Sequence, residues 1–150
     1  MKKWKFSLES VRQLKNRIEE EAAQKHARAL MGVLRAKALL AETEKELNTA
    51  ALMQFAGSGK KSSAVELSQV AQYVTVLEKQ RRERLEKVLH AERDVTLARA
   101  ALEKVARERE ILDKLHDRQH SNHQFHVARQ EQKWVDDLAQ QMKRGLLTAV

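Results

Sequence analysis

Residues 74–112 read VTVLEKQRRERLEKVLHAERDVTLARAALEKVAREREIL. Steps of three and four residues connect a mostly apolar series through this segment, and that spacing is typical of the seam of a coiled coil. The series is Val74, Leu77, Arg81, Arg84, Val88, Ala91, Val95, Ala98, Leu102, Val105, Arg109 and Leu112. A second set flanks this seam and is expected to widen it, namely Leu85, Leu89, Ile111 and Leu115. The segment therefore predicts a long amphipathic helix that packs against a partner helix.

A less regular pattern of the same kind precedes this segment. Its apolar positions are Val11, Leu14, Ile18, Ala29, Val33, Ala36, Leu40 and Leu47, and the phase slips near Ala22 and His26. Such a slip is expected to unwind the supercoil locally. Residues 57–63, GSGKKSS, are the one break in composition between the two patterns and predict a turn. Ser63 with Glu66 forms a capping-box signature, so a helix should begin near Ala64.

These signals predict an all-α fold, a long antiparallel two-helix coiled-coil hairpin in which the second helix overhangs the first. We expect one domain over residues 1–150, with helix one at about 7–55, the turn at 57–63 and helix two at about 64–143. Gly145 is expected to stop the second helix. Because the connection is short, the helices should run in opposite directions. Helices of this length need a partner along the seam to be stable.

Composition excludes several classes of protein. The chain has no proline, four glycines, 33% charged residues and only 4% aromatic residues, which fits helices with a narrow seam better than a wide core. It has no cysteine, so disulfide frameworks and thiolate chemistry are excluded. Glu9 and Arg12 interrupt the N-terminal region where a signal peptide would need an apolar run, and we expect a soluble protein. The net charge of +8 is spread over both halves of the chain.

Three chemical motifs are tempting but incomplete. Gly59-Lys60-Lys61-Ser62 lacks the glycine and the hydroxyl residue that a phosphate-binding loop needs at fixed positions. Paired carboxylates such as Asp136 and Asp137 have no predicted pocket behind them. His116, His120 and His123 share one helix face at possible ligand spacing, and whether this face binds a metal stays open. We expect a protein that is not an enzyme, with no catalytic residue, no cofactor and no assigned metal ligand.

Three segments of the chain resemble the FliJ family, the coiled-coil stalk proteins of flagellar type III protein export. The first is FSLESVRQLK at residues 6–15, the second is YVTVLEK at 73–79, and the third is DRQ at 117–119 continued by EQKWVDDLA at 131–139. The order and spacing of these segments fit the family over nearly the whole chain.

The resemblance implies a cytoplasmic protein at the inner-membrane face of the export apparatus, attached to the membrane through its partners. It implies that the paired terminal ends bind the hexameric export ATPase and promote its activity, that the half near the turn binds the membrane export-gate protein, and that export chaperones are escorted. The expected gate contacts are Tyr73, Leu77, Arg84 and Leu47. Leu77 also fits ordinary seam packing, and Arg84, a charge in the seam, must extend to solvent or find an acidic partner.

The expected ATPase contacts are Phe6, Leu8, Val11, Trp134, Val135, Leu138 and Met142. The last four fall at helical spacing in the overhang, where helix one supplies no partner. Two alternatives stay open from the residues alone. One is a generic coiled-coil adaptor of another, injection-type secretion system, and the other is a basic protein that binds nucleic acid or a membrane surface. No nucleic-acid partner is expected, since the few aromatic residues are scattered and form no stacking platform.

Overall fold

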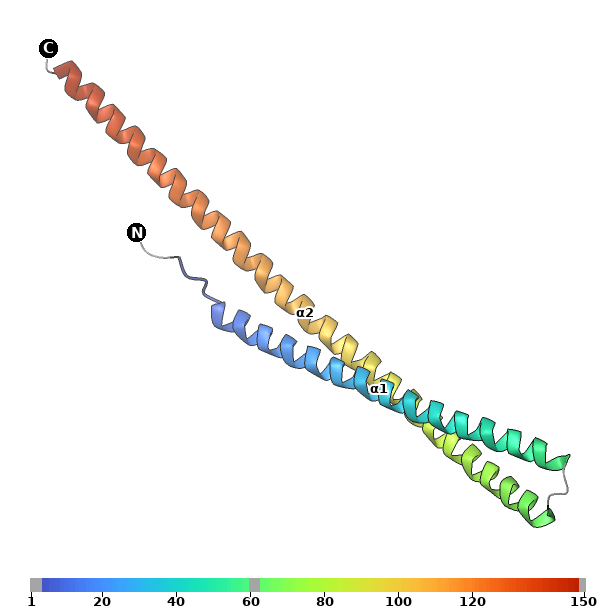
Figure 1. The fold of residues 1–150 in the computed structure, drawn as a ribbon. Coiled ribbons are helices and arrows are strands. Elements are labelled where there is room, and N and C mark those ends of the chain that lie inside the picture. The colour runs from blue at the N-terminus through green and yellow to red at the C-terminus, as the bar shows by residue number, and fades with distance from the viewer. Residues whose placement is uncertain (1–3, 60–62, 149–150) are drawn as a thin grey trace. The chain divides into compact units, whose positions relative to one another are not determined.

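The computed structural model describes residues 4–59 and 63–148 and consists of two long α-helices (Figure 1). Helix α1 spans Glu9–Ser58 and helix α2 spans Ala64–Thr148. The described residues are 95% helical and contain no strand. The predicted all-α class is confirmed.

The start of α2 is fixed by the predicted capping box. The Ser63 backbone N–H donates to the Glu66 carboxylate at 3.3 Å, and the Ser63 hydroxyl accepts from the Val65 N–H at 3.3 Å. These two bonds satisfy donors that a helix N-terminus leaves without intrahelical partners. The predicted start at Ala64 is therefore confirmed.

Both helices run further than their glycines suggest. Helix α1 continues past Phe55 and includes Gly57, and α2 continues through Gly145 to Thr148 instead of ending near Lys143. A glycine inside a helix costs only about 1 kcal/mol relative to alanine, so a single glycine does not by itself end a helix. Residues 57 and 58, which were predicted as part of the turn, therefore belong to α1. Residues 60–62 of the predicted turn lie outside the described part of the chain.

The chain divides into two compact units. Unit 1 comprises Met1–Glu19 with Val105–Val150, and unit 2 comprises Glu20–Lys104. Each unit contains a segment of α1 beside a segment of α2, running in opposite directions. In unit 1, Arg12 contacts Asp113 and Glu19 contacts Arg109; in unit 2, Lys37 contacts Glu92 and Glu44 contacts Arg81. The prediction that residues 1–150 form one domain stays a prediction.

The seam of unit 2 has a narrow but well-buried core. Its least exposed side chains are Thr43 at 0%, Leu77 at 2%, Ala50 at 3% and Val88 at 5%. Every predicted seam position of α2 from Val74 to Leu112 is buried or half-buried except Arg81. The seam register read from α2 is therefore correct. The expected widening is wrong for Leu85, Leu89 and Ile111, which are exposed, because two helices alone can cover only one stripe of each other's surface.

The predicted seam at the start of α1 is wrong for Val11 and Leu14, whereas Ile18 is half-buried. Leu14 is 54% exposed and Val11 is 39% exposed, whereas the charged residues Arg12, Lys15 and Glu19 are half-buried. These three positions continue, in steps of three and four, into the half-buried series Ala22, His26, Ala29, Val33, Ala36 and Leu40. No phase slip is needed, because Arg12, Lys15 and Glu19 already follow the register of this later series.

Candidate partner-binding surfaces

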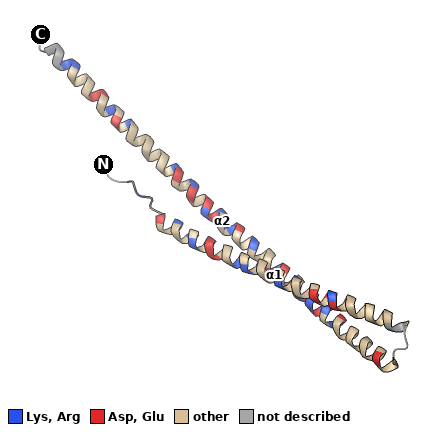
Figure 2. Ribbon diagram, in the orientation of Figure 1, with Lys and Arg blue, Asp and Glu red and all other residues tan. Residues whose placement is uncertain are grey.

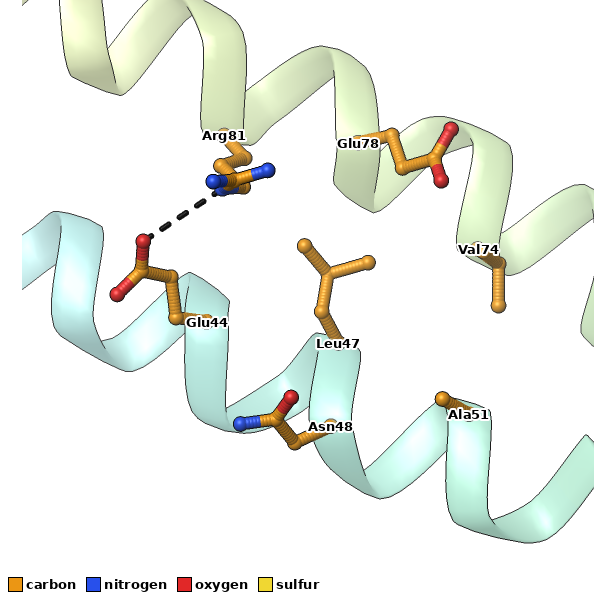
Figure 3. A pocket seen from close by; sticks show the side chains of 7 residues that line it. All are labelled: Glu44, Leu47, Asn48, Ala51, Val74, Glu78 and Arg81. Carbon is orange, nitrogen blue, oxygen red and sulfur yellow. Dashed lines mark ion pairs between the residues drawn. The ribbon is translucent and has the colours of Figure 1, made fainter.

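An open groove lies between the two helices of unit 2 on one side of the seam. Its walls are Glu44, Leu47, Asn48 and Ala51 from α1 and Val74, Glu78 and Arg81 from α2 (Figure 3). Leu47 points toward α2 between Arg81 and Glu78, and an ion pair of 3.5 Å joins Arg81 Nε to Glu44. We call this surface the Leu47 groove. It combines an apolar floor with a charged rim.

A second groove in unit 2 contains Tyr73. It is lined by Glu42, Lys45, Glu46, Thr49, Ala50, Met53 and Tyr73, and it shares no residue with the Leu47 groove. Tyr73 is 50% exposed and Met53 is 62% exposed. The Tyr73 side chain is thus accessible to a partner from this groove. We call this surface the Tyr73 groove.

Arg84 lies inside the seam and is bonded to α1. Its guanidinium Nη1 donates to the main-chain carbonyl oxygen of Leu39 at 2.7 Å and to the hydroxyl of Thr43. The Thr43 hydroxyl in turn donates to the same Leu39 carbonyl at 3.0 Å. The alternative of an acidic partner is therefore not found among the described residues: Arg84 is half-buried, and its Nη1 bonds a carbonyl and a hydroxyl oxygen of α1.

The structure does not bring the four expected gate contacts to one surface. Tyr73 and Leu47 lie in different grooves, Leu77 is 2% exposed, and Arg84 is half-buried in the seam. Of the four, Tyr73 is exposed, Leu47 and Arg84 are half-buried and Leu77 is buried, so Leu77 offers almost no side-chain surface to a partner. The role of all four in gate binding stays a prediction.

In unit 1, two aromatic residues ahead of α1 pack on the histidine face of α2. The Trp4 ring centroid lies 5.1 Å from that of His116, 4.8 Å from that of His120 and 6.4 Å from that of His123. Phe6 lies 5.1 Å from His116 and is only 7% exposed. We call this group the Trp4–histidine cluster. The sequence reasoning missed it, although the spacing of the three histidines on one helix face was visible.

The same histidines were a candidate for metal binding. Within the part of the chain that the structure describes, no group of three His, Cys, Asp or Glu residues is arranged to hold a metal ion. The His116 and His120 rings are stacked with centroids 6.3 Å apart, and Trp4 lies against both. The Gly59–Ser62 motif lies largely outside the described residues, since 60–62 are not among them.

A network of ion pairs joins the beginning of α1 to α2 in unit 1. Arg12 Nε donates to Asp113 at 2.6 Å, and Lys15 Nζ donates to Glu108 at 2.5 Å. Arg109 bonds both Glu19 of α1 and Asp113 of its own helix. The hydrogen bond from Arg12 lowers the pKa of the Asp113 carboxyl below its ordinary value of 3.8, in spite of partial desolvation. The hydrogen bond to Glu19 raises the pKa of Arg109.

The C-terminal part of α2 presents an exposed apolar stripe. Trp134 is 69% exposed, Val135 54%, Leu138 41% and Met142 72%. We call these four residues the terminal stripe. All residues from Ala128 to Arg144 are exposed, so α1 covers none of this segment.

The expected ATPase contacts near the chain start are less accessible. Phe6 is buried, Leu8 is half-buried, and Val11 is 39% exposed. Phe6 packs on His116, and Trp134 follows His116 by roughly 27 Å along α2 at 1.5 Å per residue. The structure does not bring these two sets of residues together, and their role as contacts stays a prediction.

Charged residues are scarce in the segments of α1 and α2 that flank the connection (Figure 2). Helix α1 has no charged residue from Leu47 to Ser58, and α2 has only Glu66 before Glu78. Among the described residues, neither helix is apolar enough over a sufficient length to cross a membrane.

Comparison with known proteins identifies the family. A family model described as "Flagellar FliJ protein" matches residues 4–145. No curated protein and no solved structure matches the chain. The matched range includes the whole of α1, the part of α2 that pairs with it and the terminal stripe. Since the match covers nearly the entire sequence and the fold is the expected all-α one, the chain belongs to the FliJ family, whose members are coiled-coil components of flagellar protein export.

Proposed function

We propose that this protein is the stalk of a flagellar type III export apparatus, with unit 1 binding the hexameric export ATPase and unit 2 binding the membrane export-gate protein. The family match supports an export component that is structural and not an enzyme. Binding to partners at the inner-membrane face from the cytoplasm, promotion of the ATPase and escort of export chaperones are further parts of this proposal.

The observation that carries the proposal is the terminal stripe. Its four apolar side chains are 41–72% exposed and recur at steps of three and four along α2. A helix face of this kind is normally buried against another element, so an apolar face without a partner in its own chain marks an interface. Lys133 and Lys143 lie beside the stripe and are exposed, which favours a partner surface with acidic residues.

The test is stimulation of the purified export ATPase by the full chain and by two variants. Leu138→Asp places a charge in the stripe without changing the seam, and deletion from Lys133 onward removes the stripe completely. We expect both variants to lose most of the stimulation while their circular dichroism shows intact helices. Leu97→Asp is the matched control, because Leu97 is 70% exposed in unit 2. Full stimulation by the deletion variant would disprove the stalk role of this segment.

The gate contact is proposed for Tyr73, whose side chain is half exposed in the Tyr73 groove. Aromatic residues are among the commonest energetic anchors of protein interfaces, since they bury a large area at low entropic cost. Leu77 and Arg84 support this contact from within the seam by fixing the position of α2 against α1.

A further inference from the structure

The end of α1 next to the connection is apolar on nearly every side. All residues from 51 to 56 are exposed, and they are Ala51, Leu52, Met53, Gln54, Phe55 and Ala56. Leu52 is 70% exposed, Met53 62% and Phe55 82%. Because a helix has about 3.6 residues per turn, consecutive residues point in all directions around its axis. The terminal stripe is different, since the carboxylates Asp136 and Asp137 are exposed on the same turns of α2.

The adjoining part of α2 continues this surface. Val65 is 64% exposed. Helix α2 has no charged residue from Leu67 to Leu77, just as α1 has none from Leu47 to Ser58 (Figure 2). We call residues 51–58 of α1 and 64–70 of α2 the apolar tip.

Few charges lie near the apolar tip. Glu66 is the one carboxylate of the sequence between Glu46 and Glu78. It accepts the Ser63 backbone N–H at 3.3 Å and so satisfies a donor at the start of α2. The sequence also has Lys60 and Lys61 in the connection, outside the described residues.

The uncharged parts of both helices end at the same level. The ion pair of Glu44 with Arg81 shows which residues of α1 and α2 lie opposite each other. Just beyond this pair, the last charged residues before the uncharged parts are Glu46 and Glu78. From Glu46 to Ser58 the helix rises roughly 18 Å. Helices at a membrane surface bury apolar side chains about 5–10 Å deep, and the hydrocarbon core is about 30 Å thick. The uncharged part is therefore long enough to enter one leaflet and too short to span a bilayer.

We propose that the apolar tip enters the surface layer of a lipid bilayer. A groove of a partner protein covers one side of a helix, whereas lipid surrounds an inserted helix end, which fits an end that is apolar nearly all round. The hydrogen-bonded start of α2 lowers the cost of insertion, because backbone donors without partners are costly away from water. This direct lipid contact goes beyond the proposed gate contact and does not require the gate protein.

The experiment is flotation of the full chain with vesicles of phosphatidylcholine, alone or mixed with phosphatidylglycerol, without the gate protein or the ATPase. The wild type is expected to float with both kinds of vesicle, since binding at a membrane surface follows the apolar area that is buried. Leu52→Gln should lower the partition coefficient about tenfold, the order expected when one large apolar side chain is lost from an apolar environment. Leu97→Gln is the matched control and should bind as the wild type does, because Leu97 is also 70% exposed but lies between Asp94 and Arg99.

A second readout locates the contact on the chain. The chain has no cysteine, so Leu52→Cys or Leu97→Cys can carry a single environment-sensitive fluorophore. With vesicles, emission from position 52 should shift to shorter wavelength and be quenched by a quencher attached to the lipid tails. Emission from position 97 should do neither. Circular dichroism of each variant in solution verifies that the helices are intact.

Three results overturn the lipid contact. The first is a wild type that does not float, and a dimer that Leu52→Gln dissociates would then show that a second copy covers the tip. The second is flotation that requires phosphatidylglycerol, is abolished by salt and is unchanged by Leu52→Gln, because it is adsorption of a basic chain to an anionic surface. The third is flotation without a response at position 52. Each of these results leaves the gate and ATPase proposals standing, since their assays contain no vesicles.

Discussion

Arg84 of α2 bonds the main-chain carbonyl oxygen of Leu39 in α1 at 2.7 Å, and the buried Thr43 hydroxyl lies between them. This polar contact lies in the part of the seam that also contains the buried side chains of Leu77 and Val88. It fixes the two helices at one register, since a shift along the seam would leave the guanidinium without these acceptors.

We predict that Arg84→Met lowers the free energy of unfolding by about 1 kcal/mol. The substitution keeps an apolar stem in the seam but removes the hydrogen bonds, whose net contribution is of that order. Urea titration followed by circular dichroism measures the difference. Arg82→Met, at an exposed neighbouring position, should change stability little. An equal loss in both variants would mean that the bonds to Leu39 and Thr43 contribute nothing specific.

Tyr73→Ala and Leu77→Ala should separate surface from core. Tyr73 is 50% exposed, so its removal should weaken gate binding and leave the melting midpoint nearly unchanged. Leu77 is 2% exposed, so its truncation should cost about 2–5 kcal/mol of stability, as for other buried leucines. Thermal melts and the gate-binding assay give both readouts. A melting midpoint lowered equally by the two variants would place Tyr73 in the core.

Lowering the pH should weaken the ion pair between Arg12 of α1 and Asp113 of α2, because the Asp113 carboxylate becomes protonated. The folded pKa of this carboxyl lies below its ordinary value of 3.8 because Arg12 donates a hydrogen bond to the ionised form. As the pH falls, Asp113 is therefore protonated in the unfolded chain before it is protonated in the folded one. The contribution of this ion pair to the free energy of unfolding is fully present above pH 3.8 and is lost as the pH falls through the pKa of the folded state.

The measurement for Asp113 is the melting midpoint of the wild type and of Asp113→Asn as a function of pH. The variant should melt at a lower temperature at neutral pH, and the two curves should converge in acid, where both side chains are uncharged. Asp137→Asn, at an exposed position of α2, serves as the control. A difference that persists unchanged below the folded pKa would show that the charge of Asp113 is not its source.

The Trp4–histidine cluster should hold the residues ahead of α1 against α2. Trp4→Ala removes ring contacts with His116, His120 and His123, and it should lower hydrogen-exchange protection of the amides at the start of α1. Trp4 fluorescence, recorded in a Trp134→Phe background, should shift to longer wavelength in His120→Ala as the indole becomes more hydrated. Trp134→Ala, in the exposed stripe, should leave protection at the start of α1 unchanged.

Periodicity was sufficient to predict α2 and the central part of the seam. Val74, Leu77, Val88 and Leu102 recur at steps that only a helix brings to one face, and the structure buries or half-buries each of them. The capping residues Ser63 and Glu66 located the start of α2 for an equally local reason. These signals depend on neighbours in the same chain segment, which the sequence displays directly.

The remaining features depend on residues that are far apart in the sequence. The partners of Arg12, Lys15 and Glu19 lie 90 to 101 residues away in the sequence. Val11 and Leu14 were therefore predicted as the seam in their place. The packing of Trp4 on the histidines has no local signature either. Prediction of a charged seam requires both helices to be aligned before their charges are compared.

The ion-paired seam of unit 1 and the more apolar seam of unit 2 should differ in their response to ionic strength. Dissolved ions screen the attraction between Arg12 and Asp113 or Lys15 and Glu108, but they do not weaken apolar contact such as that of Leu77 and Val88. We therefore expect rising ionic strength to separate the start of α1 from α2, while the helices of unit 2 stay packed against each other. The segment assigned to the ATPase would then loosen with salt, and the segment assigned to the gate would keep its shape.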